Sequence, residues 1–356
     1  MLSEKNLTVG YDAGPLLDPP TGVGRYTSEL ARALEIRGVE LRRYAVAWKG
    51  KPPDDVQRIR MPAKLAHRTW RAFGRPSVER AVGDVDLVHA TNYVLPPTKA
   101  PGVVTIHDLT FLRDDVYPGG QRLRKLVPES LRRAARVITP SVAIADELAE
   151  RCEYPRDKIS VTHEGVSEEF FAASPLSDTA LGRLGIAGRF VIAVGTIEPR
   201  KNLRTLLAAW RKAELDGHTL VIAGPKGWGP ALPETPGVVL TGWVGDSTLP
   251  GLYAAADAFC YPSLYEGFGL PPVEAMAAGT PVVAGAYSAA TEILGSAALI
   301  VDPLDADALA GAIRQALTDD ATRAQLRVAG RARAAAYTWD ATGKATIDCY
   351  RSVIQG

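Results

Sequence analysis

The sequence predicts an α/β protein built from two doubly wound domains, each with a parallel sheet. Short apolar runs alternate with helical patterns along the chain, and this alternation is typical of βα units that assemble into a parallel sheet. The pattern loosens over residues 168–189 and then restarts. A length of 356 residues also favours two domains, and a hydrophobic content of 46% is enough for two cores.

Strands are predicted wherever a short apolar run is bounded by polar or turn residues. In the first half these runs are 7–11, 41–47, 87–90, 103–106, 137–139 and 159–162, and in the second half they are 190–195, 219–223, 238–240, 258–261, 281–284 and 298–301. Predicted helices include 26–36, 202–211, 306–317, 321–336 and 339–354. With a hinge near residues 171–175, we expect domains at 1–172 and 173–337 and a last helical segment at 338–356.

Composition and charge favour an ordinary cytoplasmic enzyme. The net charge of +1 gives no general attraction to nucleic acid. The three cysteines, Cys152, Cys260 and Cys349, lack the number and spacing of a disulfide framework or a zinc site. The N-terminus has no apolar h-region of a signal peptide, and no run of eighteen apolar residues occurs anywhere in the sequence. We therefore expect a chain that is neither exported nor membrane-spanning.

Residues 265–281 carry the strongest chemical pattern, because Glu266 and Glu274 bracket two glycines and a proline pair at a strand-to-helix turn. Pro271 and Pro272 are placed to open the helix, and Glu274 would fall in its first turn. The amides of residues 267–270 would then lie beside a helix N-terminus, where backbone N–H groups and the helix dipole bind anions. An alternative for Glu274 is simple stabilisation of the helix dipole.

Arg200 and Lys201 form the second pattern. They follow the strand predicted at 190–195 and precede the helix predicted at 202–211. The helix dipole disfavours cations at this end, so a cation found there usually has an anion to meet. The alternative is a solvated helix start with Asn202 as its N-cap.

Residues 263–284, which include Glu266-x7-Glu274, resemble the signature of retaining nucleotide-sugar glycosyltransferases with the GT-B architecture, glycosyltransferase family four. Residues 194–203, Val-Gly-Thr-Ile-Glu-Pro-Arg-Lys-Asn-Leu, resemble a second block of that family, and weaker matches occur at 21–25, 105–108 and 161–166. The resemblance runs almost end to end. It implies two Rossmann-like domains that face each other across a cleft, with the C-terminal helix crossing back to the first domain.

The resemblance implies transfer of a hexosyl group, with mannosyl favoured, from a nucleoside diphosphate sugar to a hydroxyl of a glycan or glycolipid, with retention at the anomeric carbon. Arg200 and Lys201 would neutralise the leaving diphosphate, and Glu266 would orient the donor sugar. The donor-binding residues implied are Gly24, His107, Gly267, Phe268, Gly269, Leu270 and Glu274, the last of these at the ribose. GDP-mannose is the favoured donor and UDP-hexoses come next, with a base pocket near residues 241–246. No metal or other cofactor is expected.

Other polar features have plainer alternatives. Gly22-Val-Gly24 between the first strand and helix could be only a tight turn. His107 could be a structural histidine at a strand end, and His89 and His163 are read as core or loop residues. Asp84-Val-Asp86 resembles a metal-binding Asp-x-Asp, but it precedes a strand and would lie at the opposite end of the sheet from a ligand. It is read as a turn.

Two basic stretches in the first domain, 56–80 and 121–136, allow two interpretations. They could be solvated helix faces, or they could dock on anionic lipid at the inner face of the cell membrane, as suits a lipid-linked acceptor. Neither carries a nucleic-acid-binding motif, so no nucleic acid partner is expected.

Two other functions stay open from the sequence: an isomerase or phosphorylase of the same two-domain shape, and a non-catalytic protein that only binds a nucleotide sugar. The complete Glu-x7-Glu and Arg-Lys set favours the transferase. One departure from the family pattern is Thr291, which stands where that pattern has proline.

Overall fold

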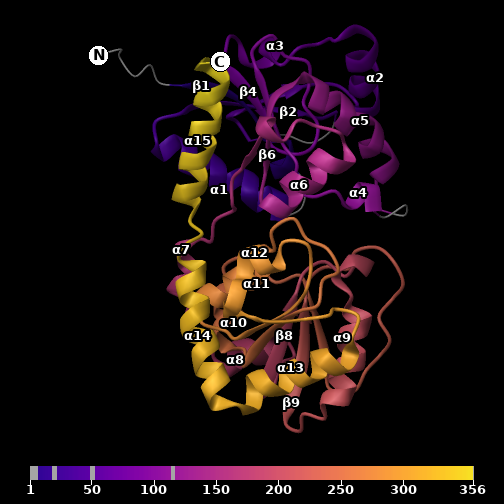
Figure 1. Ribbon diagram of the computed structural model, residues 1–356, viewed down its shortest axis with the longest axis vertical. Helices are drawn as coiled ribbons and strands as arrows, with labels where there is room; N and C mark the ends of the chain where they lie inside the picture. Colours follow the sequence, from indigo (N-terminus) through magenta and orange to yellow (C-terminus); the bar gives the residue numbers. More distant parts are fainter. Residues whose placement is uncertain (1–6, 18–21, 49–52, 114–116, 356) are drawn as a thin grey trace. The chain divides into compact units, whose positions relative to one another are not determined.

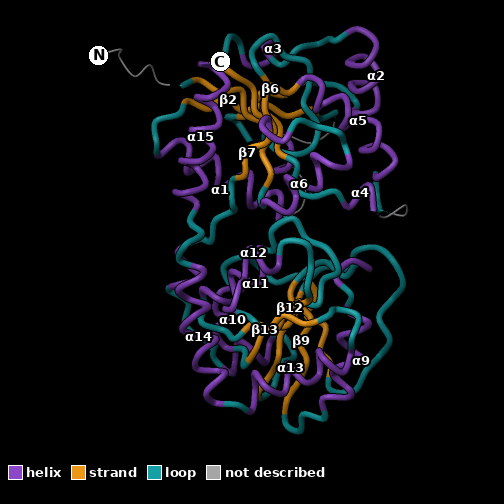
Figure 2. The backbone as a smooth tube through the Cα atoms, viewed as in Figure 1, coloured by secondary structure: helices purple, strands orange, loops and turns teal. Residues whose placement is uncertain are grey.

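Within residues 7–17, 22–48, 53–113 and 117–355, which the computed structural model describes, the strands form two sheets with parallel pairing throughout (Figure 1). The sheets belong to two units, Met1–Glu164 with Trp339–Gly356 and Gly165–Thr338. In each unit the strands lie at the centre and helices surround them (Figure 2). The predicted α/β class with two doubly wound parallel sheets is therefore confirmed.

The sheet of the first unit has the order β3-β2-β1-β4-β5-β6-β7 in the described residues. Its strands are β1 Thr8–Asp12, β2 Glu40–Val46, β3 Val56–Ile59, β4 Leu87–Ala90, β5 Gly102–Thr105, β6 Ala134–Thr139 and β7 Ile159–Val161. The helices of this unit are α1 Gly22–Ile36, α2 Ala63–Phe73, α3 Glu79–Val82, α4 Thr110–Arg113, α5 Gly120–Arg133, α6 Val142–Arg151 and α15 Trp339–Gln355, with 3₁₀ turns η1 Gly14–Leu17 and η2 Arg156–Lys158.

Strand β3 corrects the interpretation of residues 56–80 as helix faces alone. Residues 56–59 pair in parallel with residues 43–46 of β2 and form the edge of the sheet. The run is short and mixes Gln57 and Arg58 with apolar residues, so its alternation is weak. Charged side chains and short length are common in edge strands, because they discourage pairing with other chains.

The sheet of the second unit has the order β10-β9-β8-β11-β12-β13. Its strands are β8 Arg189–Val194, β9 His218–Ala223, β10 Val238–Gly242, β11 Ala258–Tyr261, β12 Val282–Gly285 and β13 Leu299–Val301. The helices are α7 Glu168–Phe171, α8 Asp178–Arg183, α9 Leu203–Ala213, α10 Leu249–Ala255, α11 Leu270–Ala277, α12 Ala290–Leu294, α13 Ala306–Thr318 and α14 Asp320–Ala334, with 3₁₀ turns η3 Pro199–Lys201 and η4 Gly295–Ala297.

Packing in the second unit follows the two faces of its strands. Alternate residues such as Val191, Leu220 and Cys260 point to one face and form a core with α9 and α13. On the opposite face, Phe259 of β11 lies edge-on to Tyr253 of α10, with ring centroids 5.4 Å apart. Both faces are covered, which explains why these strands read as continuous apolar runs.

The strand order has a topological switch point between β8 and β11, which is the place where the chain changes the direction in which it adds strands to the sheet. The chain runs from β8 outward to β9 and β10, and it then returns to form β11 on the other side of β8. The connections that leave β8 and β11 therefore diverge at the carboxyl end of the sheet, where open α/β sheets bind ligands.

Helix α15 packs on the first unit. The hydroxyl of Tyr350 lies 2.6 Å from Nδ1 of His89 in β4, and both side chains are fully buried. A Cβ on Gly343 would come within 3.0 Å of the Cβ of Ala33 in α1, so glycine permits this close approach. No helix among the described residues is both long and apolar enough to cross a membrane.

Candidate active site

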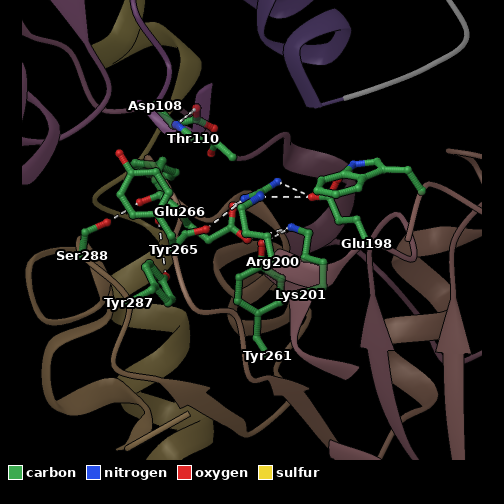
Figure 3. A network of polar contacts seen from close by, with 12 residues as sticks. Asp108, Thr110, Glu198, Arg200, Lys201, Tyr261, Tyr265, Glu266, Tyr287 and Ser288 are labelled. Carbon is green, nitrogen blue, oxygen red and sulfur yellow. Dashed lines mark hydrogen bonds and ion pairs between the residues drawn. The ribbon is translucent and has the colours of Figure 1, made fainter. Parts of the chain in front are cut away.

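Arg200, Lys201 and Glu266 form one ion cluster at the switch point of the second unit (Figure 3). Arg200 and Lys201 lie in η3 just after β8, and Glu266 follows β11. The Arg200 guanidinium donates through Nη1 to Oε2 of Glu266, and Lys201 Nζ donates to Oε1 at 2.8 Å. The two patterns found separately in the sequence thus meet in a single site.

Backbone geometry beneath the cluster holds the two cations in place. Gly195 at the end of β8 has a φ of +146°, and a Cβ there would lie 3.1 Å from Cε of Lys201. Asn202 has a φ of +54°, and its Nδ2 donates to the carbonyls of Pro262 at 3.2 Å and Pro303 at 2.6 Å. These contacts fasten the loop after β8 to the loops after β11 and β13.

The structure changes the interpretation of Asn202. Helix α9 begins at Leu203, so Asn202 precedes it, but its side chain does not accept a hydrogen bond from a helix N–H. Its Oδ1 instead accepts from the hydroxyl of Thr205 at 2.7 Å. Asn202 therefore ties loops together rather than capping the helix.

Burial and charge set the ionisation of the cluster. Burial alone would raise the pKa of Glu266, but the charges of Arg200 and Lys201 outweigh it and lower this pKa to about 2. Burial also lowers the pKa of Lys201 from its ordinary value, against the opposing effect of Glu266. Lys201 Nζ donates to the Tyr261 hydroxyl at 2.7 Å and lies 4.8 Å from the centre of that ring. Glu266 is a carboxylate at neutral pH.

Glu198 is a fourth member of the cluster. Its Oε1 accepts from Nη2 of Arg200 at 2.6 Å and from Nε at 3.1 Å. Arg200 also donates through Nη1 to the Tyr265 carbonyl at 3.0 Å. The formal charges of Glu198, Arg200, Lys201 and Glu266 sum to zero.

The turn after Glu266 leads directly into α11. The Glu266 carbonyl accepts from the Ser288 hydroxyl at 2.8 Å, and the Phe268 carbonyl accepts from the Tyr287 hydroxyl at 3.3 Å. Gly269 has a φ of +96° and a Cβ there would lie 2.5 Å from the Tyr287 oxygen, so only glycine fits. Residues 267–270 are all buried, and the prolines predicted to open the helix do lie at its start.

Glu274 is not in the first turn of α11, which corrects the prediction. The helix begins at Leu270 and its first turn holds no acidic residue. Glu274 is 2% exposed and its Oε2 accepts from the Tyr253 hydroxyl at 3.3 Å. Dipole stabilisation is therefore a weak explanation for a carboxylate buried one turn into the helix.

Gly24 and His107 belong to the first unit. Gly24 is buried within the first turn of α1, which begins at Gly22, so Gly22-Val-Gly24 is helical rather than a turn between strand and helix. His107 is 8% exposed and donates through Nε2 to the Thr91 carbonyl at 2.9 Å. Its Nδ1 lies 3.6 Å from Oε1 of Glu164.

The remaining polar candidates have structural surroundings. His89 is fully buried, as predicted for a core residue, and His163 accepts at its backbone carbonyl from the Thr342 hydroxyl at 2.8 Å. Asp86 accepts from the backbone N–H of Thr8 at 2.8 Å, at the amino-terminal end of the sheet. Among the described residues, no group of three or more His, Cys, Asp or Glu side chains could hold a metal ion.

Sequence reasoning missed several residues that shape the site, namely Glu198, Trp228, Tyr261, Tyr287 and Ser288. Glu198 carried a signal, because an acid two residues before Arg200 can pair with it when the segment turns. Tyr261 ends the strand β11 just before Glu266. Trp228, Tyr287 and Ser288 come from other segments, and only the folded sheet brings these to the cluster.

Comparison with known proteins now decides the family. Residues 187–333 match the family described as "Glycosyl transferases group 1", and residues 20–170 match "Glycosyltransferase Family 4". The O-antigen chain mannosyltransferase B of Escherichia coli is 30% identical over 95% of this chain and 97% of its own. The chain belongs to glycosyltransferase family four. Both halves contribute to the match, so the glycosyltransferase resemblance found in the sequence is confirmed along the chain.

Solved structures give the same architecture. The sucrose-phosphate synthase from Thermosynechococcus elongatus superimposes with a TM-score of 0.77 over 98% of this chain and 100% of that one, at 23% identity. HepE of Anabaena, solved in complex with UDP and glucose, gives a TM-score of 0.76 over 98% and 100%, at 18% identity. This glycosyltransferase thus shares the GT-B fold with proteins of low sequence identity.

Proposed function

We propose that this glycosyltransferase moves a mannosyl group from GDP-mannose to a hydroxyl of a glycan or lipid-linked acceptor, with retention of configuration and without a metal ion. The observation that carries the proposal is the cluster of Arg200, Lys201 and Glu266 at the switch point of the second unit. The similarity to an O-antigen chain mannosyltransferase supports the sugar. The HepE complex with UDP and glucose supports a nucleotide-sugar donor and makes UDP-hexoses the second choice.

In the proposed reaction, Arg200 and Lys201 stabilise the negative charge that develops on the leaving diphosphate. The bond between the anomeric carbon and the phosphate oxygen breaks, and the acceptor oxygen bonds to that carbon on the same face. The acceptor proton passes to the departing phosphate oxygen. Fixed cations in a buried site need little reorganisation during this step, and removing one such contact typically costs about 100-fold to 1000-fold in rate.

Glu266 is suited to orient the donor sugar while it holds both cations. Each carboxylate oxygen has more than one acceptor position, so Oε1 and Oε2 can each accept a sugar hydroxyl beside Lys201 and Arg200. A glycosidase would need a second carboxylic acid poised to protonate a leaving group. Glu274 is buried against Tyr253, which does not favour that role.

The other donor contacts in the proposal follow the turn into α11. Pro271 and Pro272 have no N–H. The backbone N–H groups at this helix start therefore come from the residues before them, and we propose that they bind the diphosphate of the nucleotide sugar. Glu274 is proposed at the ribose, and Gly24 and His107 are proposed as donor contacts from the first unit.

The test is mass spectrometry of the purified protein incubated in EDTA with GDP-mannose, UDP-glucose, UDP-N-acetylglucosamine, ADP-glucose and dTDP-rhamnose. We expect slow release of GDP from GDP-mannose, abolished by Arg200→Ala and by Glu266→Ala but retained in Arg211→Ala, whose arginine is an exposed cation of α9. Activity that is lost in EDTA and restored by manganese would contradict metal independence. Epimerised sugar nucleotide would favour an isomerase, and binding without turnover with every acceptor tried would favour a non-catalytic protein.

A membrane-bound acceptor is proposed from the two basic stretches. Helices α2 and α5 lie against each other, because Arg122 Nε donates to Nδ1 of His67 at 2.9 Å and Arg133 Nη2 to the Trp70 carbonyl at 3.2 Å. On α2, Leu65 is 49% and Phe73 is 77% exposed. Exposed cations on the two helices are Arg68, Arg122, Lys125 and Arg132, whereas the side chains of Lys64 and Arg71 lie outside the described part.

Exposed apolar side chains among cations are typical of helices that lie on anionic bilayers. We expect the protein to float with phosphatidylglycerol vesicles at low salt and Phe73→Ser to weaken this. No flotation at low salt would exclude the membrane contact.

A further inference from the structure

The carboxylate of Glu198 joins the candidate active site to a neighbouring loop. Its Oε1 accepts from Nη2 and Nε of Arg200, and its Oε2 accepts from the indole Nε1 of Trp228 at 3.1 Å. Only 10% of the Glu198 side chain is exposed. Trp228 is half-buried and lies in the connection from β9 to β10, so this contact links two separate segments of the second unit.

The two segments are in contact along their length. Ile197 pairs with Lys226 as a parallel bridge, and the Ile197 N–H donates to the Pro225 carbonyl at 3.0 Å. A Cβ on Gly224 would lie 2.1 Å from the Gly195 carbonyl oxygen, and one on Gly227 would lie 2.5 Å from Cγ2 of Thr196. The loop at residues 224–229 therefore forms a close-packed support for the segment that carries Arg200.

The contacts fix the plane of the Arg200 guanidinium. Nε and Nη2 face Glu198, while Nη1 faces the Tyr265 carbonyl and Glu266. A guanidinium bound on both edges cannot rotate about its long side chain without breaking several charge-assisted hydrogen bonds. Trp228 in turn leaves Glu198 few alternative positions.

We propose that Glu198, held by Trp228, is a positioning residue that sets the orientation of Arg200 for glycosyl transfer. This inference rests on the proposed function, because it assumes that Arg200 acts on the leaving diphosphate. Glu198 touches neither the donor nor the acceptor in this proposal. In metal sites, mutating an outer-shell group that orients a ligand typically costs about 10-fold to 100-fold in activity, and we expect a loss of that order for Glu198.

A contribution to the stability of the folded protein is a poor explanation for the ion pair between Glu198 and Arg200. A buried ion pair is often no more stabilising than apolar residues of similar size, because desolvation offsets the attraction. The negative charge of Glu198 also weakens the attraction of Arg200 and Lys201 for a diphosphate. A group that opposes substrate binding at this position is better explained by control over the geometry of Arg200.

This reasoning predicts opposite effects on binding and turnover. In Glu198→Gln the cluster gains one net positive charge, so the KM for donor should stay the same or fall. The amide of the new side chain has only one oxygen, so its N–H₂ group must face either the Trp228 N–H or the Arg200 guanidinium. Both of these are hydrogen-bond donors, so one of the present contacts is lost. Arg200 should lose its fixed orientation, and kcat should fall by about 10-fold to 100-fold. Trp228→Phe should lower kcat in the same way, by a smaller factor.

The experiment combines donor kinetics with nitrogen-15 NMR of the arginine Nε–H groups, the Arg200 signal being assigned by its loss in Arg200→Lys. We expect a slowly exchanging Arg200 Nε–H in the parent protein, broadened or lost in Glu198→Gln and Trp228→Phe. Glu234→Gln is the matched control, because it removes an equal charge from an exposed position in the same β9 to β10 connection.

Each outcome is decisive. An Arg200 signal that persists in both variants, or a KM that rises together with the fall in kcat, overturns the proposal. If the signal is lost in the variants but the parent protein consumes no donor with any acceptor tried, the orientation of Arg200 by Glu198 is upheld and the proposed function fails instead.

Discussion

Replacing Glu266 by glutamine removes the negative charge that two largely buried cations share, and the cost can be worked out from the pKa of this group. The pKa is about 2 in the folded protein against an ordinary value of 4.5. At about 1.4 kcal/mol for each pH unit, the difference corresponds to about 3 kcal/mol of the free energy of unfolding at neutral pH. The side chain is only 9% exposed, so solvent screens this contribution little.

The sign follows from proton binding. Since the folded pKa lies below the unfolded one, the unfolded chain binds the proton first as the pH falls, and the stabilisation is lost between about pH 4.5 and pH 2. We therefore expect Glu266→Gln to be about 3 kcal/mol less stable than the parent protein at pH 7. The difference should fall to about half of this at pH 3.

Urea titrations at pH 7 and pH 3 measure this difference, and urea is preferred because guanidinium would screen the ion pairs. Hydrogen exchange in peptides from β8 and β9 restricts the readout to the second unit, since two units can unfold separately. Glu234→Gln, an exposed charge change in the same unit, should have little effect. A Glu266→Gln protein that is destabilised equally at both pH values would refute the electrostatic reasoning, because only loss of shape or hydrogen bonds would then explain it.

Two further predictions concern His89 in the first unit and two glycines, Gly224 and Gly311, in the second. Burial lowers the pKa of His89 to about 3, so the stability of the first unit should fall as the pH drops from about 6.5 towards 3. The raised pKa of Asp12, about 6, has the opposite effect on the pH dependence of stability in that unit. Urea titrations must therefore compare the parent protein with His89→Gln. If the free energy of unfolding changes equally with pH in both proteins, the prediction is wrong. Gly224→Ala should lower both the thermal midpoint of the second unit and the transfer rate, because its Cβ would meet the Gly195 carbonyl at 2.1 Å and its φ is +154°. Gly311→Ala, in open space on α13, should instead stabilise by about 0.5–1 kcal/mol, and equal effects of the two changes in calorimetry would refute the steric argument.

Much of the fold could be predicted because it depends on local patterns. The buried strands β8, β9 and β11 are continuous apolar runs with turn residues on both sides, and they stand out from the helices by length and composition. Strand β3 could not be found in this way. Its four residues are partly polar, and only pairing with β2 makes them a strand.

The site was predictable where the chemistry is carried by neighbouring residues. Arg200 and Lys201, or Glu266 and the following glycines, each form a pattern within one short segment. Their meeting depends on the strand order β8-β11, which periodicity does not reveal. The register of α11 was also beyond reach, because proline at the second helical position fits a helix that starts at Leu270 as well as one that starts later.

The return of the chain to the first unit at Trp339 has a consequence for biosynthesis. The central sheet of that unit is finished at Val161, yet the helix that buries Tyr350 against His89 is the last described element to leave the ribosome. All of Gly165–Thr338 must be synthesised in between. The second unit can therefore fold as soon as it emerges, whereas the first waits with an uncovered apolar face. Nascent chains stalled before residue 339 should bind chaperones through the domain that was translated first.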